Sequence, residues 1–214
     1  SDGMPFLIPE EEKAINKVIV DKATRKKLKI LFKEVDAREK EYKKDRKGFL
    51  KLLDKVSKVQ TSTPEDFGKI GRDFQEKNAE VYDFMINIRT KLGSYVSNEE
   101  WTEIIENGKK EFYKADKDYE KVYPKFEKDV DKLNQRIAQS LADENSVKLI
   151  QERLLSFGTL TLKNAKSLNT YNVYENDVYN NIHSSTKELE AVSDELLKLR
   201  SEVFDEYVAI HQLI

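Results

Sequence analysis

Apolar residues recur along most of the chain at intervals of three, four and seven, the spacing of amphipathic helices that pack lengthwise. From Pro9 to about residue 58 they form one such series: Leu28, Val35, Tyr42, Phe49 and Val56, with Leu31, Phe32, Leu52 and Leu53 between them. This series predicts a single long helix with a coiled-coil-like seam. Between residues 36 and 48 the seam thins to Tyr42 within a run of charges. We expect that stretch to be either weakly packed or, by preference, a solvated face.

Thr63 and Pro64 mark the start of a second helix, because threonine is a good N-cap and proline fits the first helical position. The seven-residue spacing continues through Phe67, Phe74, Val81, Ile88 and Tyr95, with Ile70, Phe84 and Leu92 between them. Gly93 is the expected end of this helix, since glycine commonly follows the last helical turn.

Ser97 and Glu100 have the spacing of a capping box, and Val96 and Trp101 have that of the hydrophobic staple that accompanies it. A third helix therefore begins here, about three residues after the second ends. So short a connection predicts that the two helices lie antiparallel. Apolar spacing extends the third helix to about residue 141, with a bend expected between residue 118 and Pro124 because proline interrupts helical hydrogen bonding.

The remaining residues predict two further helices. Apolar spacing favours one helix over about 145–168 and a last one over about 172–212. Residues 167–185 are rich in Asn, Tyr, Ser and Thr, which are weak helix formers. We therefore expect a loop or kink at 169–172.

The composition agrees with an all-helical chain. With 7 Gly and 4 Pro in 214 residues there are few turn formers, whereas 36% charged and 38% hydrophobic residues suit helices with one buried stripe. We expect an all-α fold, an elongated antiparallel bundle of four or five long amphipathic helices with coiled-coil-like seams. Residues 10–214 should form this single domain, preceded by a short tether over 1–9.

Other features bear on the compartment. The chain has no cysteine, which excludes disulfides and thiolate chemistry. No apolar run reaches the length of a membrane span, and no intact signal peptide is present. The apolar, proline-bounded start is typical of an exported or lipid-anchored protein after processing, with an anchor before Ser1, although a trimmed chain would look the same. We favour the cell envelope, periplasmic or membrane-anchored, over the cytoplasm.

Charge is distributed unevenly. The net charge is −2, yet residues 13–58 contain 17 Lys or Arg against 7 Asp or Glu. We expect this basic helix to pack against its acidic neighbours, which would compensate its charge; the alternatives are binding to anionic lipid or to nucleic acid, and we do not favour nucleic acid as a partner. An anion would be attracted where cations crowd the thin part of the seam, at Lys40, Lys43, Lys44, Arg46 and Lys47.

Catalytic and metal-binding patterns are missing from the sequence. Neither His183 nor His211 has an acid three positions earlier, as the carboxylate-bridged metal bundles require. The acids around Glu99 to Glu106 are expected to form surface ion pairs with nearby lysines. No phosphate-binding loop or nucleophile motif occurs. We therefore expect no enzyme, no cofactor and no metal site.

Tyrosine and asparagine interleave between residues 169 and 181. Tyr171, Tyr174, Tyr179, Asn172 and Asn176 are candidates for a partner surface, because tyrosine gives amphipathic contact area at low entropic cost. The same residues also suit a partly polar bundle core.

The segment Ser97-Asn98-Glu99-Glu100-Trp101-Thr102-Glu103-Ile104 resembles the helix-starting stretches of small helical cell-envelope proteins of the periplasmic or lipoprotein type. This resemblance covers eight residues and implies an envelope protein. We expect a non-catalytic interaction or scaffold protein with a protein partner. The alternative is a ligand-responsive binder: a metal or stress sensor, or a chaperone-like protein.

Overall fold

The computed structural model of the chain describes residues 11–59, 61–107, 143–168 and 177–213, with isolated positions between 124 and 139. These residues form helices and contain no strand, so the all-α prediction is confirmed. The helices are α1 (Glu11–Val18), α2 (Lys22–Ser57), α3 (Pro64–Gly93), α5 (Glu144–Leu168), α7 (Asp177–Asn180) and α8 (Thr186–Leu213), and residues 98–107 are also helical.

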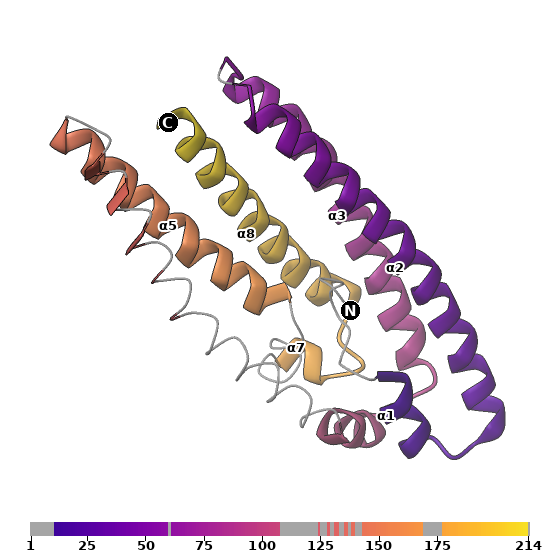
Figure 1. Cartoon of the computed structure of the whole chain (residues 1–214). Coiled ribbons are helices and arrows are strands. Elements are labelled where there is room, and N and C mark those ends of the chain that lie inside the picture. The colour runs from indigo at the N-terminus through magenta and orange to yellow at the C-terminus, as the bar shows by residue number, and fades with distance from the viewer. Residues whose placement is uncertain are drawn as a thin grey trace.

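Four long helices lie side by side in the order α2, α3, α8, α5 (Figure 1). Neighbours in this row run in opposite directions (Figure 1). Asp45 of α2 pairs with Lys77 of α3 whereas Glu34 pairs with Lys91. In the same way Gln75 of α3 bonds to Leu197 whereas Arg89 bonds to Asn181, just before α8. The short helix α1 packs on α2, and α7 packs on α8. Within the described residues α2 stands at one end of the row, with α3 on one side and its opposite face directed outward.

The apolar seam of α2 packs against α3. Leu28, Leu31 and Val35 are buried as predicted. Tyr42 is 1% exposed, so the expectation of a solvated face there is wrong at this residue. Its hydroxyl donates to Oδ1 of the buried Asn78. Because this partner is 36 residues away in the chain, the charged residues next to Tyr42 gave no sign of its burial. Leu52, expected in the seam, is instead 54% exposed.

The predicted single helix from Pro9 to residue 58 is broken between α1 and α2. Asp21 is the N-cap of α2, with its carboxylate accepting from the Thr24 backbone N–H at 2.9 Å. Arg25 donates to the backbone oxygens of Asn16 and Ile19, which the end of α1 leaves without helical partners. Ile15 and Ile19 belong to the same buried cluster as Leu28 and Val35, so the apolar pattern continues through this corner.

The predicted caps in the middle of the chain are confirmed. Thr63 and Asp66 form a reciprocal capping box at the start of α3, and α3 ends at Gly93. Ser97 and Glu100 also bond reciprocally, at 3.0 and 3.1 Å. Val96 and Trp101, the predicted staple, are both buried. The third helix is confirmed over 98–107; its expected bend between residue 118 and Pro124 lies outside the described residues, apart from Pro124 itself.

The predicted last helix over 172–212 is also interrupted. Residues 181–185 separate α7 from α8, and Ser185 and Glu188 form a capping box at the start of α8. This connection is held against the end of α3, where a side chain at Gly93 would lie 2.8 Å from the Ile182 oxygen. The backbone N–H of Ile182 also donates to Asn98. The loop or kink expected at 169–172 lies outside the described residues, and α5 confirms the helix predicted over 145–168.

No helix in the described ranges combines the length and apolar character that crossing a membrane requires.

Candidate functional site

Two features of the described residues are candidates for function. One is a pocket between the long helices, and the other is a row of lysines on the outer face of α2. The pocket has a volume of about 200 Å³ and opens to the surface. Four helices line it: α2 with Phe49 and Leu53, α3 with Gly71, Phe74, Gln75 and Asn78, α5 with Phe157, and α8 with Arg200, Val203, Phe204 and Tyr207.

The walls of this pocket are mainly aromatic. Phe49 and Phe74 stack in parallel with ring centroids 4.1 Å apart. Phe204 lies against the backbone of α3, because a Cβ atom at Gly71 would come within 3.0 Å of three carbon atoms of the Phe204 ring. Glycine at this position therefore lets α8 approach α3 closely. The aromatic side chains give the pocket an apolar interior large enough for one small ring.

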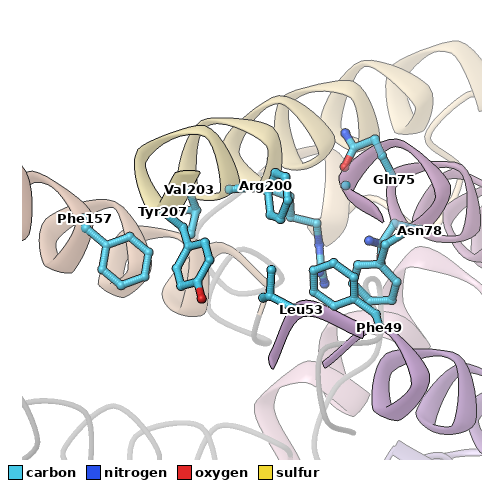
Figure 2. A pocket seen from close by; sticks show the side chains of 11 residues that line it. Phe49, Leu53, Gln75, Asn78, Phe157, Arg200, Val203 and Tyr207 are labelled. Atoms are coloured by element: carbon cyan, nitrogen blue, oxygen red, sulfur yellow. The ribbon is translucent and has the colours of Figure 1, made fainter. Parts of the chain in front are cut away.

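Polar groups collect at one end of the pocket, where Asn78 and Arg200 lie near Phe49 (Figure 2). Asn78 is 1% exposed, and its Oδ1 accepts from Tyr42 at 2.9 Å. Within the described residues its Nδ2 group makes no hydrogen bond. Gln75 Nε2 donates to the Leu197 oxygen at 2.8 Å, so this amide is oriented by α8. The Nδ2 group of Asn78, whose side chain Tyr42 holds in place, is therefore a hydrogen-bond donor beside an apolar space.

Arg200 connects this end of the pocket to a buried tyrosine. Its Nε donates to the Tyr82 hydroxyl at 2.7 Å. Burial raises the pKa of Tyr82 to about 12, and the Arg200 cation opposes this rise by favouring the phenolate. Tyr82 is therefore protonated at neutral pH and serves as the acceptor that holds Arg200 in place.

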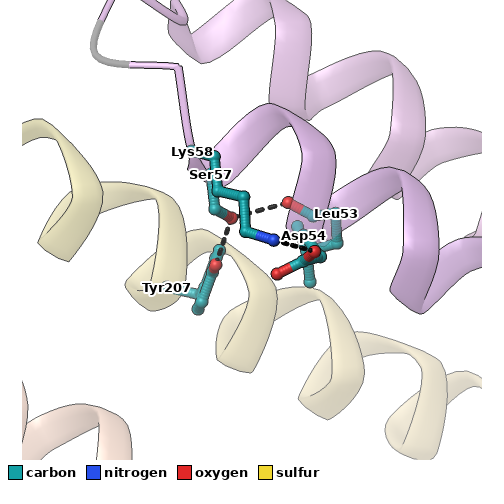
Figure 3. Close-up of polar contacts among 5 residues, drawn as sticks. All are labelled: Leu53, Asp54, Ser57, Lys58 and Tyr207. Carbon is teal, nitrogen blue, oxygen red and sulfur yellow. Dashed lines mark hydrogen bonds and ion pairs between the residues drawn. The ribbon is translucent and has the colours of Figure 1, made fainter.

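At the other end of the pocket, Tyr207 joins α8 to three helices. Its ring contacts Phe67 of α3 and Phe157 of α5, with centroids 6.1 and 6.0 Å away. Its hydroxyl bonds to Ser57 of α2 (Figure 3). Since Ser57 donates its own proton to the Leu53 oxygen at 2.6 Å, Tyr207 is the donor in this bond. Lys58 and Asp54 form an adjacent exposed ion pair.

The outer face of α2 carries the second feature, which we call the lysine ridge. It consists of nine lysines spaced three or four residues apart, with one interval of seven: Lys22, Lys26, Lys29, Lys33, Lys40, Lys44, Lys47, Lys51 and Lys55. At 100° per residue they share an arc of about 80° on the helix surface. All nine are exposed. None of them takes part in the ion pairs among the described residues.

The predicted anion-attracting patch contributes three members to this ridge. Lys40, Lys44 and Lys47 belong to it, whereas Lys43 pairs with Glu39 at 3.4 Å and Arg46 is partly buried. The patch was visible in the sequence as a local cluster. Its continuation along the whole helix was missed, although a 3.6-residue repeat of lysine could have revealed it.

The expected pairing of the basic helix with acidic neighbours is wrong for the described ion pairs. Between α2 and α3 these pairs have the opposite polarity: Asp45 and Glu34 of α2 accept from Lys77 and Lys91 of α3. The apolar seam of α2 faces α3, so its lysines are carried to the opposite side. Burial of the seam, and not charge pairing, therefore sets the orientation of this helix.

The other candidate residues are not brought together. Tyr171, Tyr174, Asn172 and Asn176 lie outside the described residues, and the side chain of Tyr179 is not described. His183 is exposed, and His211 belongs to α8 without a described side chain. In the described part of the chain no three His, Asp or Glu side chains gather in a way that could hold a metal ion.

Comparisons of the chain with protein-family models, with curated proteins and with solved structures gave no match.

Two glycines on helices provide a matched test of the packing at the pocket. Gly71→Ala should destabilise the protein by about 1–3 kcal/mol, because the new methyl group displaces Phe204 from α3. Gly48→Ala in α2 should stabilise it by roughly 0.5–1 kcal/mol, since open space surrounds Gly48 and alanine is the better helix former. Urea unfolding followed by circular dichroism measures both changes; equal effects would contradict the close approach of α8 to α3.

Alkaline unfolding tests the burial of Tyr82. Because its folded pKa of about 12 lies above the ordinary value of 10.0, the stability that Tyr82 contributes is complete below pH 10 and is lost as the pH rises from 10 to 12. Between pH 9 and pH 11 the free energy of unfolding of the wild type should fall by about 1 kcal/mol more than that of Tyr82→Phe. Parallel losses in the two proteins would show that Tyr82 ionises normally.

Proposed function

We propose that this chain is a non-catalytic interaction protein, a helical scaffold that engages an extended anionic partner through the lysine ridge of α2. The observation that supports this proposal is the row of nine exposed lysines that pair with no described carboxylate. Like charges so arranged repel one another. An anionic partner would relieve that repulsion and release the counterions that screen it.

The anchoring of α2 supports a binding role for the ridge. Tyr42 and the apolar residues of the seam are buried against α3, so α2 cannot rotate to hide its lysines. The carboxylates of Glu34 and Asp45 are drawn sideways towards α3 by their lysine partners. The charges are thus held in one line before any partner arrives, which lowers the entropic cost of binding.

The architecture of the whole chain is part of the proposal. We propose that residues 10–214 form one elongated antiparallel bundle of four or five helices with coiled-coil-like seams. The alternating directions of α2, α3, α8 and α5 support it. Such a rod would present the ridge along one of its long edges.

We also propose that the protein resides in the cell envelope and acts there on a macromolecular partner. The resemblance of residues 97–104 to helical envelope proteins supports this location. Fractionation of cells that produce the full-length gene product tests it, and recovery in the cytosol alone would contradict it.

Binding to heparin, used as a general polyanion, tests the role of the ridge. The chain should bind at low salt and dissociate as ionic strength rises. Replacing Lys26, Lys33, Lys40 and Lys47 by glutamine should weaken binding by at least tenfold, because four of the nine positive charges of the ridge are removed. Isothermal titration or elution from a heparin column measures the effect.

A control with the same change in net charge separates the ridge from overall charge. The exposed lysines Lys69, Lys148, Lys187 and Lys198 lie on α3, α5 and α8. Replacing these four by glutamine should change heparin affinity by less than threefold. An equal loss in both variants, or no binding by the wild type, would refute the proposal.

The pocket supports a second candidate function, a ligand-responsive binder. We propose that it accepts a small aromatic molecule that carries a hydrogen-bond acceptor, since Asn78 places an amide donor beside an apolar space of about 200 Å³. Contacts with α2, α3, α5 and α8 would let such a ligand alter how these helices pack.

Two compounds of similar shape test this candidate. Acetophenone should bind with a dissociation constant of roughly 1 mM, and ethylbenzene, which lacks the carbonyl acceptor, more weakly. The side-chain amide signal of Asn78 in a ¹⁵N NMR spectrum should shift only with acetophenone. Val203→Phe, which places a ring inside the pocket, should abolish binding; unchanged binding in that variant would locate the ligand elsewhere.

A further inference from the structure

The shape of the lysine ridge favours some classes of anionic partner over others. From Lys22 to Lys55 the helix rises over a length of about 50 Å. Most consecutive ridge lysines are about 5 Å apart along the axis, which is less than the screening length of about 8 Å at physiological salt. The interval from Lys33 to Lys40 is about 10 Å long and contains the exposed Asp36. The ridge therefore acts as two segments of positive charge along one straight line.

A straight line of this length fits a flat anionic surface better than a double helix. The phosphates of duplex DNA wind around the axis with one turn per 34 Å, so a straight ridge meets each strand only where the two cross. A flat bilayer surface lets all nine lysines approach head groups at once. The geometry thus favours a planar array of phosphates.

The residue type agrees with this choice. The three arginines of α2, Arg25, Arg38 and Arg46, are partly buried and lie outside the arc of the ridge, so the exposed cations of this face are lysines. Sequence-reading contacts in DNA grooves and bidentate phosphate clamps favour arginine. Lysine binds as a hydrated point charge on a flexible stem and suits fluid head groups that offer no fixed geometry. The ridge also contains no aromatic residue on which single-stranded bases could stack.

One exposed apolar residue borders the ridge. Ile30, next to Lys29, is 58% exposed and lies on the helix surface about 20° from the edge of the lysine arc. Leu50 and Leu52 are also exposed but project about 100° to either side of the ridge centre, away from any surface on which the ridge lies. An apolar side chain at the edge of the ridge can enter the boundary between head groups and acyl chains. A purely aqueous polyanion offers nothing to it.

We infer that the lysine ridge of α2 lies flat against a bilayer that contains anionic lipid, with Ile30 at its edge entering the interface. This inference rests on the proposed function and names its partner. The charge of the ridge supplies the attraction, and Ile30 supplies a component that salt does not screen.

Vesicle sedimentation with the full chain tests the inference. The protein should sediment with vesicles of phosphatidylcholine that contain about one third phosphatidylglycerol and stay in solution with phosphatidylcholine alone. Each ridge lysine should contribute about fivefold to the partition coefficient at low salt. Replacing Lys26, Lys33, Lys40 and Lys47 by glutamine should therefore reduce it by about a hundredfold or more.

A charge-conserving variant asks whether the line itself matters. Exchanging two neighbouring pairs, Lys33→Glu with Glu34→Lys and Lys40→Glu with Glu41→Lys, keeps the composition and net charge but places two acids in the ridge. Vesicle binding should fall at least tenfold. Unchanged binding would show that net charge alone attracts the protein and would overturn the inference.

Ile30 distinguishes binding to a bilayer from binding to other anionic partners. Replacing Ile30 by serine should lower vesicle partition and leave heparin affinity unchanged, because this exposed residue contacts only lipid. Replacing Leu50 and Leu52 by serine is the control and should change neither, since both project away from the bilayer. Circular dichroism and the midpoint of thermal unfolding confirm that each variant is folded. Equal partition of the Ile30 variant and the wild type would refute insertion of this residue.

The competing outcomes are distinguishable. Retention on heparin without vesicle binding would overturn the bilayer inference and leave the proposed function standing. A 30-base-pair duplex that binds more tightly than the vesicles at equal salt would assign the ridge to nucleic acid. Self-association of the chain that occupies the ridge would assign it to a second copy. Absence of binding to heparin and vesicles alike would refute both proposals.

Discussion

The packing of α2 against α3 is the contact on which the rest of the described structure depends. Its apolar seam supplies the attraction, and the hydrogen bond from Tyr42 to Asn78 fixes the register. Both residues are 1% exposed, so sliding one helix past the other would leave a buried amide and a buried hydroxyl without partners, at a cost of about 1–3 kcal/mol each. This register also stacks Phe49 on Phe74 and points the lysines of α2 outward.

The two faces of α2 thus have separate roles. Residues that hold the fold, such as Leu28 and Val35, lie on one face, and the ridge lies on the other. Substitutions in the ridge should therefore have little effect on stability, because exposed positions without partners contribute little to the free energy of unfolding. The ion pairs between α2 and α3 add to this difference between the two faces. Glu34 and Asp45 of α2 pair with lysines of α3, so these two acids do not pair with the lysines of the ridge.

The pocket has a different origin. Aromatic side chains from four helices line it, and their flat rings leave a space beside Asn78 that no described side chain fills. The close approach at Gly71 brings α8 onto α3 at one wall, whereas contacts of α8 with α2 are few and include the Ser57–Tyr207 bond. The pocket arises because bulky aromatic rings pack around the side chain of Asn78, which its hydrogen bond with Tyr42 holds in place.

The sequence by itself determined the local elements, because helix caps are hydrogen bonds between residues three positions apart. The caps at Thr63 and Ser97, the end at Gly93 and the helical spacing of the seams are all of this kind. The corners at Asp21 and Ser185 also carry cap signals, but the apolar spacing runs through them and concealed the breaks. Only the tertiary structure decided that Tyr42 is buried, that Leu52 is exposed and that four helices enclose a pocket. Those outcomes depend on partners far away in the chain, such as Asn78 for Tyr42, and on which face of each helix its neighbour covers.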